Sequence, residues 1–351
     1  LLERPPHEAD IAEQVEHDIN TGGVKFDYFS PNERSRFSLF SSVQHIDRES
    51  YYGVKRDPNA YGNTADLTYV GGGQFFYHFN RLCFMPSDLM MGAEFNYDEL
   101  SDRIKGYERD FTQRTRIYSF FLQNEWKNER WSFLFGGRLD KHNMLDHVIF
   151  SPRVNLRFNP VPDLNFRASY SGGFRAPQAF DEDLHIAAVG GDVAIIQLAP
   201  GLKEEKSRSV SVSADLYHRF GRVQVNFLAE GFYTRLKDVF VLEDISKEDG
   251  IITKERRNGS GAEVMGINLE TRAVFTRWFE LQAGATIQRS RYKEPEVWSE
   301  NPDVPAEKRL FRTPDVYGYF TALLNPSRHF SVSLAGTYTG RMLVQHMAGV
   351  I

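Results

Sequence analysis

The sequence is short of the features that mark most soluble enzymes and helical membrane proteins. Its 351 residues include one cysteine, Cys83, so an intramolecular disulfide and a cysteine-based zinc site are excluded. No apolar run approaches the roughly 20 residues that a transmembrane helix requires. The net charge of −5 argues against nucleic acid as a partner. Nucleotide-binding, serine-hydrolase and metalloprotease motifs do not occur, so we expect no enzyme, no cofactor and no metal centre.

What the sequence does contain is a repeated unit of alternating apolar and polar residues. In residues 209–216, Val210, Val212, Ala214 and Leu216 alternate with three serines and an aspartate. Successive side chains of a β-strand point to opposite faces, so this period predicts strands with one apolar and one polar face. The aromatic content of 14%, with 28 Phe and 16 Tyr, suits strands that face lipid and end in aromatic girdles.

Short and long connections between these strands alternate along the chain. The short ones are rich in Pro, Gly and Asn, as tight turns require. Membrane barrels have this organisation, with short turns on one side of the membrane and long loops on the other. The pattern predicts an all-β fold, an antiparallel transmembrane β-barrel, with about fourteen strands at residues 26–29, 36–46, 64–79, 89–98, 116–127, 131–140, 148–158, 164–171, 207–219, 223–234, 266–276, 279–288, 316–324 and 330–338.

The two ends of the chain carry weaker patterns. Residues 1–23 are acidic, and we expect a loop there with a helical turn around residues 9–17. The chain opens Leu1-Leu2-Glu3, with no initiator Met, basic start or apolar core of a secretion signal. Its last residues, 349–351, fall in an outer loop. We therefore expect a fragment, with a complete pore of about fourteen strands as the alternative.

Two segments on either side of the longest loop carry a family resemblance. One reads Phe174-Arg175-Ala176-Pro177 at the end of a strand, and the other reads Leu202-Lys203-Glu204-Glu205 at the start of the next. Together they resemble the barrel of TonB-dependent outer-membrane receptors. Further matches are residues 151–153, residues 232–238, and Gly266-Ile267-Asn268-Leu269-Glu270, in which Asn268 replaces an acid. Residues 121–126 and 181–185 are similar to receptors of the Bacteroidetes.

The resemblance implies a transporter in the outer membrane of a Gram-negative bacterium, built as a 22-stranded barrel around an N-terminal plug. Residues 1–351 would be part of the barrel domain, lacking the plug, the first strands and the last strands. The implied function is import of a bulky, scarce nutrient such as a ferric siderophore, haem or cobalamin. The implied partners are TonB, acting through the absent N-terminal segment, outer-membrane lipid and the small-molecule or metal-chelate ligand. A surface lipoprotein is a further candidate partner.

Two histidines are candidate ligand-binding residues. His185 lies between the two motif segments, where some haem receptors of this family place a histidine, although the second segment here lacks the family's Asn. His346 lies in another outer loop between Met342 and Met347. Imidazole can ligate haem iron. The alternative is that both are solvated loop residues.

Three arginines on the polar face are the other candidates. Arg153 and Arg157 are four residues apart on one strand and therefore share a face, and Arg167 lies on the polar face of the next strand. Guanidinium groups suit the carboxylates or phosphates of an anionic ligand. The alternative is that they pair with acids of the plug or of adjacent strands. Two other functions stay open: a passive diffusion pore, and a soluble aromatic-rich β-sandwich or adhesin.

Overall fold

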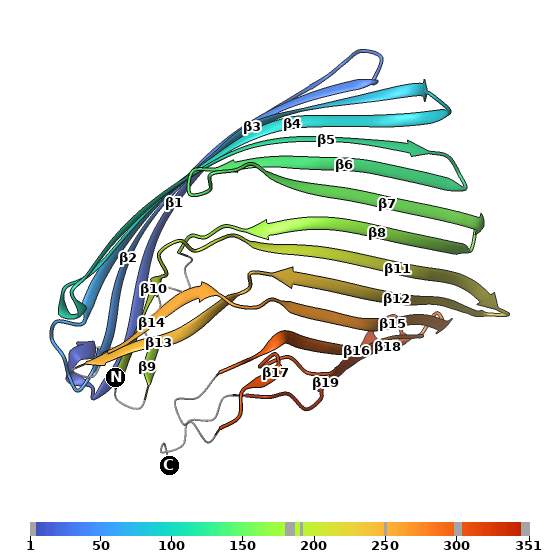
Figure 1. Ribbon diagram of the computed structural model, residues 1–351. Coiled ribbons are helices and arrows are strands. Elements are labelled where there is room, and N and C mark those ends of the chain that lie inside the picture. The colour runs from blue at the N-terminus through green and yellow to red at the C-terminus, as the bar shows by residue number, and fades with distance from the viewer. Residues whose placement is uncertain (1–4, 180–186, 190–191, 249–250, 298–303, 345–351) are drawn as a thin grey trace.

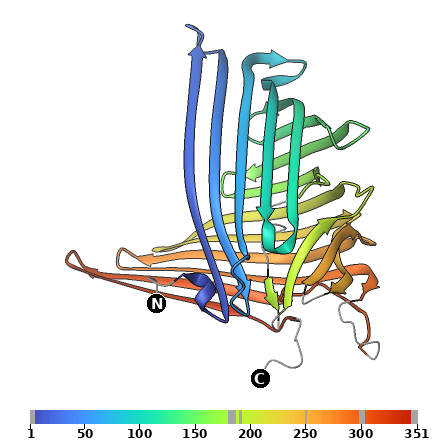
Figure 2. The ribbon, with the colours of Figure 1, turned by 90° about the vertical axis from the view of Figure 1, so that its left-hand side faces the viewer.

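The computed structural model describes residues 5–179, 187–189, 192–248, 251–297 and 304–344. Its main element is one curled antiparallel sheet, in which fourteen strands follow each other in chain order (Figures 1 and 2). The fourteen predicted strands are confirmed, and most are longer than predicted. They are β1 (Ile11–Phe29), β2 (Ser35–Val54), β3 (Tyr61–Leu82), β4 (Met85–Ile104), β5 (Arg109–Lys127), β6 (Trp131–His142), β7 (Ile149–Val161), β8 (Leu164–Arg175), β11 (Glu205–Phe220), β12 (Val223–Lys237), β15 (Ala262–Thr276), β16 (Phe279–Glu296), β18 (Val316–Ser327) and β19 (Phe330–Thr339).

The sheet has an apolar face and a polar face, as the alternation predicts. Val210 and Val212 of β11 are 45% and 57% exposed, and aromatic side chains such as Phe227 are exposed on the same side. We call this the outward face. The serines of β11 lie on the opposite, inward face, where Ser209 and Ser211 form hydrogen bonds with side chains of neighbouring strands. An exposed apolar face on a sheet of this size is what lipid contact requires.

The short turns gather at one end of the strands and the long loops at the other (Figure 1). In the β11–β12 turn, Gly221 has φ of +61°, a backbone conformation that residues other than glycine rarely adopt. The short helical elements η1 (Pro6–Glu8) and η2 (Lys105–Tyr107) both lie at the long-loop end. No helix among the described residues is long and apolar enough to cross a membrane.

The expectation of a loop over residues 1–23 was wrong. β1 begins at Ile11 and pairs with β2 along its whole length, from Ile11 opposite Val54 to Phe29 opposite Arg36. Of the described part of this segment, residues 5–23, only η1 is helical. Pairing with β2 satisfies the backbone of β1 even where acidic residues interrupt the alternation, because ladder hydrogen bonds do not depend on side-chain type.

The long loops also contain strands that the alternation did not reveal. β9 (Ala187–Val189) and β10 (Asp192–Leu198) come from the loop after β8, and β13 (Phe240–Glu248) and β14 (Ile251–Asn258) come from the loop after β12. They form a separate four-stranded sheet in the order β13-β14-β10-β9, which we call the loop sheet. The short β17 (Glu307–Arg309) pairs with β16.

Candidate functional site

The loop sheet joins two outer loops that leave the barrel wall at different strands. β10 and β14 pair in parallel, from Val193 opposite Ile251 to Leu198 opposite Arg256. On the other side, Ile195 of β10 packs against Tyr52 of β2 and Ile104 of β4. Figure 1 shows β9 and β10 close to the long-loop end of β2, and β9 contacts β2. The two loops therefore reach from β8 and β12 across to the first strands.

The two motif segments lie directly opposite each other where these loops begin. Arg175, the last residue of β8, is the register partner of Glu205, the first residue of β11. Both contact the first residue of β13. The Arg175 guanidinium lies 5.5 Å from the centre of the Phe240 ring, and the Glu205 Oε2 accepts a hydrogen bond from the Phe240 N–H at 3.0 Å. Arg256 of β14 lies over the same ring at 5.8 Å. Cation–π contacts of this kind hold the loop sheet to the wall.

A second connection runs between Lys203 and Asn258. The Lys203 N–H donates to Asn258 Oδ1 at 2.8 Å, and Asn258 Nδ2 donates to the Lys203 carbonyl at 3.0 Å and to the Asp238 carbonyl at 2.8 Å. One amide side chain thus satisfies three backbone groups of two other segments. Leu202, beside it, donates its N–H to the Ala199 carbonyl in a turn.

The segment after Arg175 turns onto the inward face of β5 and β6. Ala176 and Pro177 are buried. The side-chain amide of Gln113 of β5 forms two hydrogen bonds with the Ala179 backbone: it accepts from the N–H at 2.7 Å and donates to the carbonyl at 3.2 Å. His142 Nε2 of β6 lies 3.1 Å from the Gln178 Oε1. The Phe-Arg-Ala-Pro segment therefore directs the loop inward.

Glu204 anchors the other end of the same loop. Its carboxyl is 4% exposed and lies 2.6 Å from the Lys206 Nζ and 2.8 Å from the His147 Nε2. Burial raises the pKa of this carboxyl, but hydrogen bonds from Lys206, from the backbone and from His147 outweigh burial. The net pKa lies below the ordinary value of 4.5. Glu204 is therefore charged at neutral pH.

A buried aromatic group lies where the loop sheet meets the first strands. The Tyr107 hydroxyl donates to the Tyr52 carbonyl at 2.5 Å, and Tyr107 packs against the same cluster as Ile195. Burial, with the nearby Asp57 and Tyr51, raises the pKa of Tyr107 to about 12. Tyr107 is thus a neutral donor throughout the physiological range.

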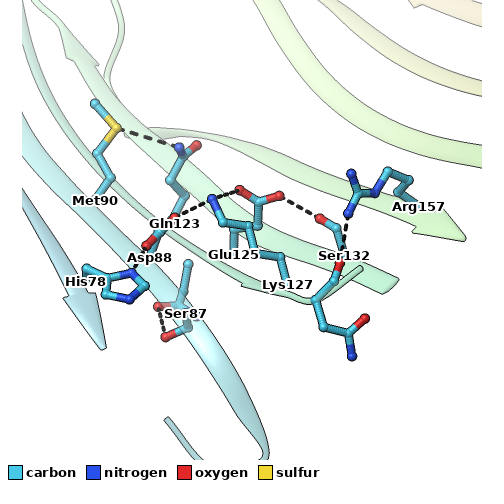
Figure 3. A network of polar contacts seen from close by, with 11 residues as sticks. His78, Ser87, Asp88, Met90, Gln123, Glu125, Lys127, Ser132 and Arg157 are labelled. Atoms are coloured by element: carbon cyan, nitrogen blue, oxygen red, sulfur yellow. Dashed lines mark hydrogen bonds and ion pairs between the residues drawn. The ribbon is translucent and has the colours of Figure 1, made fainter. Parts of the chain in front are cut away.

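Charged and polar side chains near the short turns of β3 to β6 form a network on the inward face (Figure 3). Asp88 of β4 lies 2.6 Å from His78 Nδ1 and 2.5 Å from Lys127 Nζ. Glu125 lies 3.9 Å from the same Nζ and accepts a hydrogen bond from Ser132 at 2.6 Å. Polar inner walls of this kind are expected of a barrel whose lumen holds water or a protein plug.

The structure brings the three predicted arginines together on this wall. Arg157 and Arg167 are direct register partners on β7 and β8, and Arg153 lies on the same face of β7, opposite Ser171. Arg157 Nη2 donates to the Asn128 carbonyl at 3.1 Å, and its Nε has no hydrogen-bond partner among the described residues. Arg167 Nε donates to Asn165 Oδ1 at 2.8 Å. Within the described ranges, none of the three forms an ion pair with an acid.

The predicted histidines His185 and His346 lie outside the described residues. Among those described, no group of three or more His, Cys, Asp or Glu side chains could hold a metal ion. Asn268, where the family pattern has an acid, donates to Glu230 Oε2 at 3.0 Å and accepts from Thr286 at 2.9 Å. An amide there can donate to Glu230, which a second carboxylate could not do.

Sequence reasoning missed Phe240, Asn258 and His147, which receive the motif residues. Only the alternation in residues 240–244 and 251–257 could have indicated the strands that carry the first two. What the arrangement offers is a pair of joined outer loops at the long-loop end of a polar inner wall, and on this wall three arginines of β7 and β8 form a row that could contact an anionic group.

Comparisons with known proteins agree with this geometry. A family model described as "TonB dependent receptor-like, beta-barrel" matches residues 8–343. No curated protein matches the sequence. Among solved structures, the siderophore receptor PirA of Acinetobacter baumannii aligns with a TM-score of 0.71 at 13% identity, covering 93% of this chain and 51% of that one. A mutant of the ferric enterobactin receptor PfeA of Pseudomonas aeruginosa also gives 0.71 at 13% identity, covering 93% and 49%.

The ferric-catecholate import receptor Fiu of E. coli K12 gives a TM-score of 0.68 at 11% identity, covering 95% of this chain and 55% of the receptor. The chain thus spans about half the length of the receptors that it resembles, and at these identities they establish its fold alone. The family match extends over nearly the whole chain and agrees with the motif segments and the strand order. The chain belongs to the TonB-dependent receptor family and forms strands of its outer-membrane β-barrel.

Proposed function

We propose that this protein is a receptor for a ferric siderophore, which it captures at the mouth spanned by the loop sheet and passes inward along the barrel wall. A plug and TonB, partners implied by the family, would supply the opening and the energy. The barrel lies in the outer membrane of a Gram-negative bacterium, so its long-loop end is the side that meets the ligand. Family membership favours a receptor over an enzyme.

The observation that carries the choice of ligand is the row of arginines on the inward face. Arg157 and Arg167 place two cations side by side, and Arg153 extends the row toward the long-loop end. Like charges directly opposite each other on a sheet are destabilising unless an anion joins them. Catecholate and hydroxycarboxylate chelates of Fe³⁺ are anionic, and their oxygens match the donors of a guanidinium group.

The structural relatives support the same class of ligand. PirA is named a siderophore receptor, PfeA a ferric enterobactin receptor and Fiu a ferric-catecholate import receptor. The propionates of haem could bind the same arginines, whereas cobalamin would interact with them less. The passive pore is disfavoured because the family model that matches residues 8–343 is that of a receptor barrel.

The test is uptake by cells that make the full-length protein. We expect import of ⁵⁵Fe-labelled ferric catecholate that is lost when the host lacks TonB. The substitution Arg157→Gln should raise the half-saturating concentration about tenfold, the loss of one charge-assisted hydrogen bond. Arg116→Gln, which removes an exposed cation elsewhere on the sheet, is the matched control. Uptake of haem or cobalamin alone, or uptake independent of TonB, would contradict the proposal.

A further inference from the structure

Four basic side chains form a block on the outward face of β11 and β12. Arg208 is the register partner of Arg235, and Lys206 is the register partner of Lys237. All four side chains are exposed. They lie on the apolar face, because they continue the alternation of Val210 and Val212 toward the long-loop end. The block therefore belongs to the lipid-facing side of the wall, opposite the lumen.

The protein itself balances only part of this block. Lys206 lies 2.6 Å from the buried Glu204, and Glu263 of β15 is the register partner of Arg235. Within the described residues, Arg208, Arg235 and Lys237 form no ion pair. Two successive outward positions thus place cation against cation, an arrangement that costs stability on a sheet in the absence of an anion.

The height of the block on the strand indicates which anion is available. Outward residues of β11 are apolar from Leu216 to Val210, and Tyr233 of β12, the partner of Val210, is the last aromatic residue before Arg235. A membrane strand needs about 9–11 residues, and aromatic girdles mark the edges of the hydrocarbon layer. The stretch from the short turn to Val210 covers that length. Arg208 and Arg235 therefore come at the level of lipid headgroups, on the long-loop side.

A groove of about 340 Å³ adjoins the block on the same face. Lys206 and Arg208 line one side, and Phe150, Pro152 and Tyr170 line the other. The hollow exists because Gly172 of β8 lies between Pro152 and Arg208 in register and has no side chain. Phe150 is 62% exposed. Cations beside an open apolar groove match a molecule that joins an anionic headgroup to a hydrocarbon chain.

We propose that β8, β11 and β12 carry a binding site for a phosphate-bearing lipid of the outer leaflet. The phosphate lies between Arg208 and Arg235, with Lys206 and Lys237 above them, and a hydrocarbon chain lies in the groove along Phe150 and Tyr170. Guanidinium groups form paired hydrogen bonds with phosphate oxygens. The same outward positions on β1 and β2 pair acids instead, Asp18 with Asp47 and Glu16 with Glu49, so the site is local.

The test is native mass spectrometry of the full-length protein in zwitterionic micelles, titrated with phosphatidic acid or with phosphatidylcholine. We expect saturable binding of phosphatidic acid to the wild type and about 30-fold weaker binding to the R208Q/R235Q variant, since each cation near an anionic surface contributes about 1 kcal/mol. R116Q/R277Q is the matched control, because it removes two exposed cations that lie away from the block and form no ion pair within the described residues, and it should bind like the wild type. R208K/R235K should keep most of the binding.

Equal weakening in the control pair would mean a general charge effect and would overturn the proposal. So would binding of phosphatidylcholine as strong as that of phosphatidic acid. Displacement of the lipid by millimolar inorganic phosphate would reassign the site to a free anion. Heat-modifiable migration on a gel confirms that each variant is a folded barrel, so a variant that does not fold is recognised and is replaced by the single substitutions R208Q and R235Q.

Discussion

Asn258 offers the sharpest test of whether the two outer loops behave as one unit. Replacing it with alanine removes the hydrogen bonds to the Lys203 N–H, the Lys203 carbonyl and the Asp238 carbonyl. Each hydrogen bond contributes a net 0.5–1.5 kcal/mol, roughly, to stability. Lys203 is exposed, so water replaces part of what is lost. We take about 2 kcal/mol as the loss in free energy of local opening.

Hydrogen exchange of the full-length protein in micelles measures this loss at separate amides. The amides of Phe240, which donates to Glu205, and Ala199, which donates to the Arg256 carbonyl, report on contacts between the loops. If opening is cooperative, both should exchange about 30-fold faster in the Asn258→Ala variant, the factor that corresponds to 2 kcal/mol. Asn20→Ala, which removes an amide bonded to Asp18 on β1, is the control and should leave both unchanged.

The outcome that would refute the reasoning is specific. Faster exchange at Lys203 alone, with Phe240 and Ala199 unchanged, would show that Asn258 satisfies only its immediate neighbours. The loops would then open separately, and the loop sheet would not be a unit. Unchanged gel migration is expected in either case, because the barrel wall does not depend on Asn258.

Two further predictions concern pH and packing. Because the pKa of Glu204 is below its ordinary value of 4.5, the stabilisation from Lys206 and His147 is complete above pH 4.5 and is lost as the pH falls below it. Hydrogen exchange of the His147 amide, corrected for intrinsic rates, should therefore rise below pH 4.5 in the wild type. The Glu204→Gln variant should show no such step. Gly266→Ala should destabilise the barrel by about 1–3 kcal/mol, because the added Cβ would lie 2.6 Å from the Ile287 carbonyl oxygen. Gly231→Ala, where an added Cβ has nothing within 4 Å, should be neutral. The measurement for both is the temperature at which half of the protein changes from folded to unfolded migration on a gel.

The wall of the barrel was predictable from the sequence for a physical reason. A strand with lipid on one side and a polar lumen on the other must alternate, and each strand does so by itself, as Val210 and Val212 show. The prediction failed where that constraint ends. The half of β1 at the long-loop end lies outside the apolar band of the wall, so acidic residues such as Glu13 and Glu16 can occupy it without an apolar–polar alternation. Only the pairing with β2 shows that this segment is a strand.

The loop sheet was beyond sequence reasoning for a different reason. β10 and β14 belong to separate loops and pair in parallel, so no turn links them and no local pattern sets their register. The motif segments were recognised by resemblance, but their common contact was not. Phe240 lies far along the chain from both Arg175 and Glu205, and it reaches them only because β13 and β14 fold back onto the wall.

This placement explains why recognisable motifs occur at the strand ends and not in the middle of the wall. In the strand interior, any apolar residue serves the outward face and many polar residues serve the inward face, so no particular sequence is required. At the point where a loop leaves the wall, backbone groups lose their ladder partners and need specific ones. Glu205 meets that need for the Phe240 N–H, while Arg175 packs on the Phe240 ring, and Asn258 meets it for the Lys203 backbone. Motif substitutions should therefore loosen the mouth, and with it ligand capture, before they weaken the barrel.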